Sequence, residues 1–177
     1  NYYALATPYY LMPDLESHAI TNPLLEENYY CLLPVAQGLT VKTDLPDNVS
    51  ATALLSTSSK AYSKLAGYKL ETYEKEEGDI DGPFSLAAAS TKTLDDGLES
   101  RLVWIGSAGI TDEQANARVS GGNQDLFLNA LNWLCDQEQS VTIHPKSLSV
   151  SYLTMPDTTA GILSAVVLAL IPGTVLA

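Results

Sequence analysis

Short apolar runs alternate with short amphipathic stretches along the chain, and this pattern predicts an α/β domain. A continuous apolar run of strand length predicts a strand over residues 29–36, and further strands are predicted over 51–57, 84–91 and 101–107. Alternating residues predict a last short strand over 140–144. The third and fourth strands flank Asp95-Asp96-Gly97, a turn-forming sequence that indicates a hairpin or adjacent strands. Pro34 lacks a backbone N–H, so we expect it at an edge, a bulge or the end of the first strand.

Polar capping residues mark the starts of three short helices. The sequence Thr21-Asn22-Pro23, a polar capping residue followed by Pro at the first helical position, predicts one or two helical turns over 24–28. A serine cap predicts a second short helix over 58–65, which a following glycine ends. A capping box that begins with the Thr111 hydroxyl predicts a third helix, to about residue 119.

The clearest helical periodicity lies between Gly122 and Asp136. Its apolar residues recur on one face at the spacing of a 3.6-residue helix: Leu126, Phe127, Ala130, Leu131, Trp133 and Leu134. Asn123 is the predicted N-cap. The two glycines before it allow an alternative, an anion site at the helix N-terminus, but capping explains the same residues more simply.

The end of the chain differs from the rest because no charged residue follows Asp157. Residues 158–177 have the length and apolar character of a membrane-spanning helix, and a buried core helix is the competing interpretation. We therefore predict an α/β domain over 1–145, a connector over 146–157, and a truncated transmembrane helix over 158–177. The start at Asn1, without an initiator Met, suggests a fragment of a longer protein with a larger domain.

The charge of the chain limits its partners. Nine Lys and Arg residues stand against twenty-one acids, for a net charge of −12. Affinity for phosphate backbones comes from clustered basic residues, so the composition excludes nucleic acid as a partner. Anionic lipid headgroups would repel the same surface, so contact with membrane lipid has to come from the apolar residues 158–177.

One acidic run is a candidate metal site. Closely spaced carboxylates suit a hard cation such as calcium, and the run offers Glu71, Glu74, Glu76, Glu77, Asp79 and Asp81. The spacing does not match an EF-hand loop, so we interpret the run as a solvated acidic loop. Glu74, Glu76, Glu77, Asp79 and Asp81 remain a weak candidate set, and we expect no metal, cofactor or catalytic residue.

The nucleophiles and imidazoles of the chain form no recognisable catalytic motif. Cys31 and Cys135 lie in apolar runs and are interpreted as buried hydrophobes, and whether they form a disulfide is left open. His18 and His144 have no ligand spacing for a metal, and the adjacent Glu16-Ser17-His18 is no indication of a triad, which is assembled in space. The sequence contains neither a nucleophile elbow nor a Walker motif.

Several motifs, in order, resemble the Gldg-type (gliding-motility-like) auxiliary proteins of bacterial ABC transporters. The likeness lies in the sequences of residues 16–24 (ESHAITNPL), 82–87 (GPFSLA), 122–134 (GNQDLFLNALNWL) and 144–148 (HPKSL), followed by an apolar span. The resemblance covers nearly the whole chain, and the motif at 122–134 is its most specific part.

This resemblance implies a fold and a role. The fold would be a three-layer α/β domain of the flavodoxin or glutamine-amidotransferase type. The role would be that of a non-catalytic auxiliary subunit of a transport system, on the extracytoplasmic face of the cell membrane, with ABC permease and ATPase subunits as partners. The alternative is a domain that binds a small ligand, or a degenerate amidotransferase-like enzyme.

Overall fold

The computed structural model describes residues 2–4 and 7–136. All described residues belong to one compact unit. The predicted strand over 140–144, the connector and the apolar span 158–177 lie outside the described residues. Among the helices that the structure does describe, none is long and apolar enough to cross a membrane.

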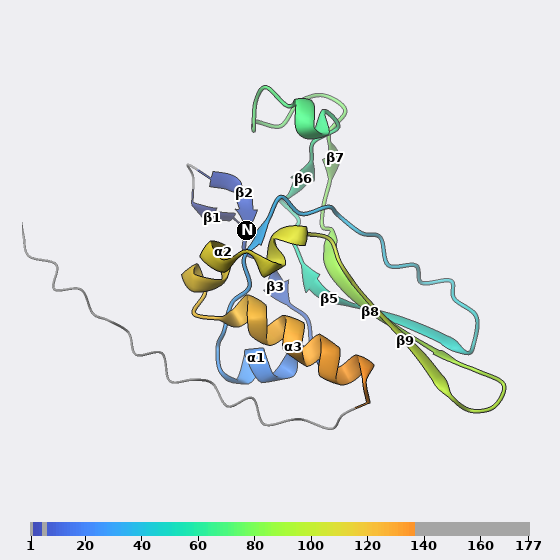
Figure 1. Cartoon of the computed structure of the whole chain (residues 1–177). Coiled ribbons are helices and arrows are strands. Elements are labelled where there is room, and N and C mark those ends of the chain that lie inside the picture. Colours follow the sequence, from blue (N-terminus) through green and yellow to red (C-terminus); the bar gives the residue numbers. More distant parts are fainter. Residues whose placement is uncertain (1, 5–6, 137–177) are drawn as a thin grey trace, which may run out of the picture. The chain divides into compact units, whose positions relative to one another are not determined.

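A four-stranded antiparallel sheet forms the centre of the domain (Figure 1). Its strands are β3 (Asp14–Leu15), β5 (Val49–Ser56), β8 (Ser85–Thr93) and β9 (Glu99–Ile105), in the order β3-β5-β8-β9. β8 and β9 form the predicted hairpin, with Thr93 opposite Glu99. Gly97, in the connecting turn, has a φ of 80°, a conformation that glycine adopts at little cost.

Two small antiparallel sheets accompany the central one. The first contains β1 (Tyr2–Ala4), β2 (Thr7–Leu11) and β4 (Leu33–Pro34), in the order β1-β2-β4. The second pairs β6 (Tyr62–Ser63) with β7 (Ile80–Asp81). Pro34 ends the short strand β4 at the outside of its sheet, which confirms the placement expected for a residue without an N–H donor.

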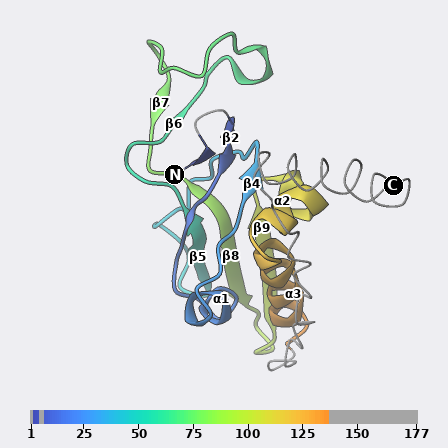
Figure 2. The ribbon, with the colours of Figure 1, turned by 90° about the vertical axis from the view of Figure 1, so that its left-hand side faces the viewer.

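The helices are α1 (Asn22–Glu26), the 3₁₀ turns η1 (Gly67–Lys69) and η2 (Ala108–Thr111), α2 (Glu113–Arg118) and α3 (Gly122–Leu134). Figure 2 shows α3 alongside β9. The cap predicted for Thr111 belongs instead to Asp112, whose carboxylate accepts a hydrogen bond from the Ala115 amide at 2.7 Å. The hydroxyl of Thr111 bonds back to the Ala108 carbonyl, because that residue ends η2.

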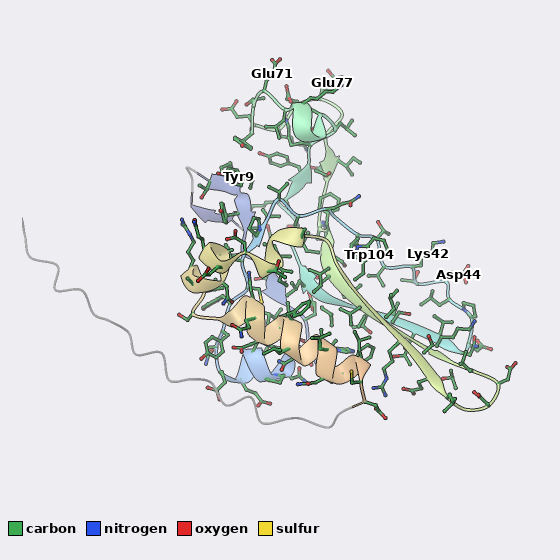
Figure 3. All side chains as sticks on the ribbon, in the orientation of Figure 1. Tyr9, Lys42, Asp44, Glu71, Glu77 and Trp104 are labelled. Atoms are coloured by element: carbon green, nitrogen blue, oxygen red, sulfur yellow. The ribbon has the colours of Figure 1, made fainter. Side chains whose placement is uncertain are left out.

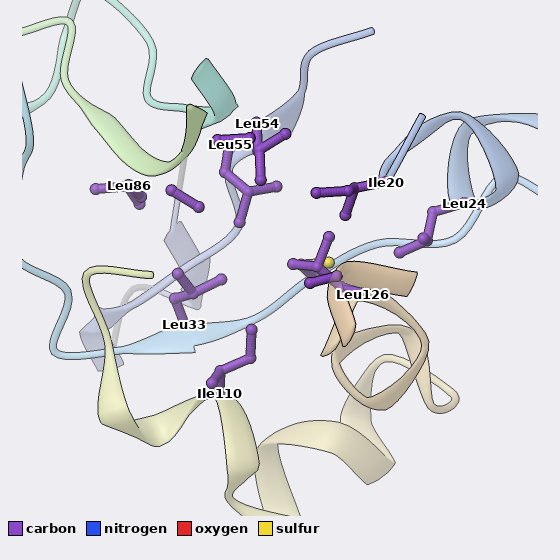
Figure 4. Close-up of a cluster of buried hydrophobic side chains, with 12 residues drawn as sticks. Ile20, Leu24, Leu33, Leu54, Leu55, Leu86, Ile110 and Leu126 are labelled. Carbon is purple, nitrogen blue, oxygen red and sulfur yellow. The ribbon is translucent and has the colours of Figure 1, made fainter. Parts of the chain in front are cut away.

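The core lies between the sheet and the helices (Figure 4). It joins residues that are far apart along the chain: Ile20, Leu24, Cys31, Leu33, Leu54, Leu55, Leu86, Ala87, Ala89, Ile110, Leu126 and Ala130. In the segment that leads into β4, Cys31, Leu32 and Leu33 are fully buried, which accounts for the apolar centre of residues 29–36, whereas Tyr30 and Val35 are exposed. Only Leu33 and Pro34 pair as a strand.

The mixed α/β class predicted from the sequence is confirmed. The flavodoxin- or glutamine-amidotransferase-like fold is not confirmed, because every strand pair in the described residues is antiparallel, whereas flavodoxin-like folds are built on parallel sheets. The helix predicted over 58–65 was wrong. Tyr62 and Ser63 instead satisfy their backbone groups by pairing with Asp81 and Ile80, far along the sequence.

Candidate functional site

The most prominent projection of the domain is the excursion between β5 and β8, which we call the acidic lobe and define as residues 58–83 (Figure 1). Thr57 and Phe84 close its base with two hydrogen bonds. The Thr57 amide donates to the Phe84 carbonyl at 2.9 Å, and the Phe84 amide donates to the Thr57 hydroxyl at 2.9 Å. The lobe is therefore held at its base by the residues that adjoin β5 and β8, the two middle strands of the central sheet.

Lys64 organises the inside of the acidic lobe. Its ammonium group lies 2.6 Å from a Glu76 carboxylate oxygen and 2.9 Å from an Asp79 oxygen. Asp79 also accepts hydrogen bonds from the backbone amides of Leu65 and Glu76, at 3.0 and 2.9 Å. A second pair joins Lys75 to Asp81 at 2.6 Å. The lobe thus folds around lysine–carboxylate contacts.

These contacts shift the acid–base equilibria of both partners. The hydrogen bond from Lys64, with those from the backbone, lowers the pKa of Asp79 to about 2. Partial desolvation opposes the charge on Lys64, but its hydrogen bonds to Glu76 and Asp79 outweigh this effect and raise its pKa. Both groups are therefore charged throughout the neutral range.

The carboxylates proposed as metal ligands do not converge. Glu76, Asp79 and Asp81 bind lysines, so ammonium groups occupy the oxygens that a cation would need. Glu74 and Glu77 point into solvent. Within residues 2–4 and 7–136, no group of three His, Cys, Asp or Glu residues is arranged to hold a metal ion.

Tyrosines line the side of the acidic lobe that meets β2. The rings of Tyr9 and Tyr73 lie 6.0 Å apart between centroids, and Tyr9 lies 5.1 Å from Tyr10. The Tyr62 hydroxyl donates to the Tyr73 carbonyl at 2.6 Å, which fixes the loop that carries Tyr73. Tyr9, Tyr62 and Tyr73 are each more than a third exposed. We call these three residues the tyrosine surface.

Carboxylates extend this surface outward. Figure 3 shows Glu71 and Glu77 at the outer end of the lobe, above Tyr9. Glu71, Glu74 and Glu77 are all exposed. An array of exposed aromatic faces beside carboxylates suits a partner that offers apolar area together with basic groups, since Tyr supplies contact area and carboxylates accept charge-assisted hydrogen bonds.

His18 has a structural environment. Its Nδ1 accepts a hydrogen bond from the Ile20 amide at 3.2 Å, and its ring meets Trp133 edge-on, with centroids 5.3 Å apart. Burial lowers the pKa of His18. The Ser17 hydroxyl donates to the Asn22 side-chain oxygen at 3.1 Å. Both Ser17 and His18 therefore make hydrogen bonds with residues at or just before the start of α1.

The two cysteines are free thiols in different environments. Cys31 is fully buried in the core, as predicted, and contacts the Gly122 carbonyl at 3.7 Å. Burial, with a smaller contribution from Asp125, raises its pKa to about 12. The interpretation of Cys135 as buried was wrong: it follows the last turn of α3, where the helix ends in solvent.

Sequence reasoning missed the role of Asn123. The N-cap of α3 is Gly121, with a φ of 95°, and Asn123 lies inside the helix. Its side chain is fully buried, accepts from the Leu32 amide at 2.8 Å and donates to the Leu32 carbonyl at 2.7 Å. A Cβ on Gly122 would lie 2.1 Å from the Tyr30 carbonyl oxygen, so only glycine permits this approach.

Comparison with known proteins adds no relative: no family model, curated protein or solved structure matches the chain.

Proposed function

We propose that the chain is a non-catalytic, membrane-anchored auxiliary subunit of an ABC-type transport system, which binds a protein or substrate outside the membrane. The observation that carries the binding role is the tyrosine surface with its flanking carboxylates. Tyrosines are enriched in protein interfaces because they bring large, rigid contact area at small entropic cost. The transport context comes from the sequence resemblance.

The state of the candidate nucleophile supports binding over catalysis. A thiol with a pKa of about 12 is almost entirely protonated near neutral pH, and Cys31 is fully buried. The Nδ1 lone pair of His18 is occupied by a backbone amide. Neither residue is therefore prepared for nucleophilic or general-base chemistry of the amidotransferase type.

The order of the lobe also supports a binding role. The lysine–carboxylate pairs and the hydrogen bond from Tyr62 to Tyr73 hold its loops in place before any partner arrives. A surface that is already ordered loses less conformational entropy on association. The acidic lobe is thus suited to present the tyrosines to an apolar and basic partner.

Copurification from native membranes tests the role. We expect the chain to retain ABC permease and ATPase subunits in mild detergent, and Tyr9→Ala combined with Tyr73→Ala to lose them. Tyr30→Ala is the matched control, because Tyr30 is also exposed, at 58%, but belongs to the segment before β4. If the wild-type chain purifies alone, the transport role is wrong. If the double variant still retains the subunits, they bind through another surface.

The membrane helix over 158–177, the extracytoplasmic location and the flavodoxin- or amidotransferase-like fold are parts of the same proposal. A membrane-impermeant maleimide tests the location, because Cys135 is exposed whereas Cys31 is buried. We expect Cys135 to be labelled in intact cells. Labelling only after the cells are lysed would place the domain on the cytoplasmic side.

A further inference from the structure

β9 is the outer strand of the central sheet within the residues that the structure describes. The Gly106 amide, directly after β9, donates to the Leu86 carbonyl at 2.7 Å. Hydrogen-bonding direction alternates along an antiparallel strand, so Leu102 and Trp104 also direct their amides toward β8. The residues that alternate with them, 101, 103 and 105, consequently direct their amides and carbonyls toward the outer edge.

The middle of β9 has the composition of a strand that pairs. Residues 102–105 (LVWI) contain neither a charge nor a proline, and their register against β8 contains no bulge. Glu99 and Arg101 lie near the start of the strand and bind each other at 2.9 Å. Edge strands that stay unpaired are usually protected by lysines, prolines or bulges, and residues 102–105 have none of these features.

Apolar side chains lie on both faces of the sheet along this edge. On one face, Leu102 and Trp104 are 57% and 56% exposed. On the other face α3 lies alongside β9 (Figure 2), and three of its apolar residues are each about two-fifths exposed. Their spacing places these three on one stripe of the helix. We call the combined area the β9 surface and define it as Leu102, Val103, Trp104, Phe127, Leu131 and Leu134.

The apolar stripe of α3 faces outward beyond β9. On the other flank of the helix, Asn129 donates to the Ile20 carbonyl at 3.1 Å and Trp133 contacts His18. His18 and Ile20 follow β3, which stands at the opposite end of the strand order from β9. By helical geometry the stripe lies on the flank away from these contacts, so it would cover whatever pairs with β9.

The β9 surface is complementary to a second copy of itself. In an antiparallel pair of β9 strands related by a two-fold axis at Val103, the outward backbone groups of Val103 meet those of the partner's Val103. Between the hydrogen-bonded positions, Leu102 lies opposite the partner's Trp104, and the reverse contact repeats it. The axis is perpendicular to the sheet, so the two α3 helices lie on the same face with their apolar stripes adjacent.

Charge favours the same surface and the same register. Two copies that each carry a net charge of −12 repel one another, so they associate best where acids are few. The β9 surface contains no acid, and Arg101 beside it binds both Glu99 and Asp136. An axis at Arg101 instead of Val103 would place two guanidinium groups opposite each other, which costs energy in a strand pair.

We propose that the protein is a homodimer in which two β9 strands pair antiparallel about Val103, so that the central sheet continues from one copy into the other. The apolar stripes of the two α3 helices pack together on one face, and Leu102 and Trp104 alternate across the axis on the other. This dimer does not involve the tyrosine surface, which belongs to β2 and the acidic lobe.

The association of the full chain in mild detergent tests the dimer. Sedimentation over a range of protein concentrations should show a monomer–dimer equilibrium. Trp104→Lys should raise the dissociation constant at least roughly 30-fold, because interfacial tryptophans are frequent hot spots of binding. Leu98→Lys is the matched control, since Leu98 is 63% exposed in the turn between β8 and β9, outside the paired residues. It should leave the dissociation constant unchanged, and circular dichroism should show both variants folded.

Disulfide formation tests the register. Chains with Leu102→Cys and chains with Trp104→Cys are mixed, each also carrying Cys135→Ser to remove the exposed thiol. Positions opposite each other without hydrogen bonds have Cα atoms about 4.5 Å apart, within the range of a disulfide. We expect a covalent dimer in this mixture. A mixture of Trp104→Cys and Ser100→Cys is the matched control, because these positions are opposite only when the axis lies at Leu102.

Three results would overturn the proposal. The first is a wild-type chain that stays monomeric at every concentration; a Val103 amide protected from hydrogen exchange in that monomer would show another segment on the edge. The second is a Trp104→Lys variant that dimerises as well as the wild type, which would place the contact elsewhere. The third is a disulfide in the control mixture in place of the test mixture.

Discussion

Replacing Asn123 is the sharpest test of how α3 is attached to the domain. Its amide group makes both hydrogen bonds to the backbone of Leu32, and both residues are fully buried. The substitution Asn123→Ala leaves a buried N–H and a buried C=O without these partners. Each unsatisfied buried group costs ~1–3 kcal/mol, so we expect the free energy of unfolding to fall by about 2–6 kcal/mol.

That loss is a large share of the ~5–15 kcal/mol that stabilises a domain of ordinary size. Urea unfolding of the full chain in mild detergent, followed by circular dichroism, measures it. Asn129→Ala is the matched control on the same helix, because Asn129 makes one partly buried hydrogen bond, to the Ile20 carbonyl. The control should lose only ~0.5–1.5 kcal/mol. Equal losses in the two variants would refute the argument from buried backbone groups.

Asn123→Asp separates hydrogen bonding from size. An ionised Asp accepts from the Leu32 amide but places negative charge against the Leu32 carbonyl, so burial and that oxygen raise its pKa in the folded state above the ordinary value of ~3.9. The folded state then binds the proton more tightly. The free energy of unfolding of the variant therefore falls furthest below that of the wild type above the raised pKa, and this difference shrinks as pH falls through that pKa. A deficit that does not change with pH would contradict this account.

Three further predictions follow from single contacts. Gly122→Ala should destabilise the domain despite the helix propensity of Ala, worth ~1 kcal/mol, because its Cβ would lie 2.1 Å from a backbone oxygen; a raised melting temperature would contradict this. Nuclear magnetic resonance should show the Asp79 carboxyl titrating with a pKa near 2. Its contribution to stability is therefore present above the ordinary pKa of 3.8 and is lost as pH falls through about 2. Lys64→Gln should raise the pKa of Asp79, and an unchanged pKa would rule out the ion pair as the cause of the shift. A thiol reagent should modify Cys135 rapidly and Cys31 only after unfolding, because Cys31 is buried and its pKa is about 12. Mass spectrometry identifies the modified residue. Fast labelling of Cys31 in the folded domain would refute its burial.

The sequence predicted the helices and strands whose own residues show a hydrophobic pattern. The strands over 51–57, 84–91 and 101–107 correspond to β5, β8 and β9, and the periodicity of 122–134 corresponds to α3. The short helix over 24–28 appears as α1, shifted toward its Thr21 cap. These succeed because burial of one face imposes a period on the residues themselves.

Predictions failed where a distant segment decides the local structure. Residues 58–65 contain good capping and helical residues, yet their backbone pairs with β7, and Lys64 finds its carboxylates at Glu76 and Asp79. Glu76 and Asp79, two members of the weak metal-site candidate, are the carboxylates that this lysine binds. Asn123 looked like a cap because its true partner, Leu32, is 91 positions away.

The sequence alone thus determined the class of the domain, its longest elements and the burial of Cys31, because hydrophobic periodicity is written into consecutive residues. It also determined the net acidic charge of the chain. The tertiary structure decided which strands pair, which carboxylates bind lysines and which tyrosines share a surface. These pairings depend on hydrogen bonds and ion pairs between residues far apart in the chain. The spacing of residues along one sequence does not predict such contacts.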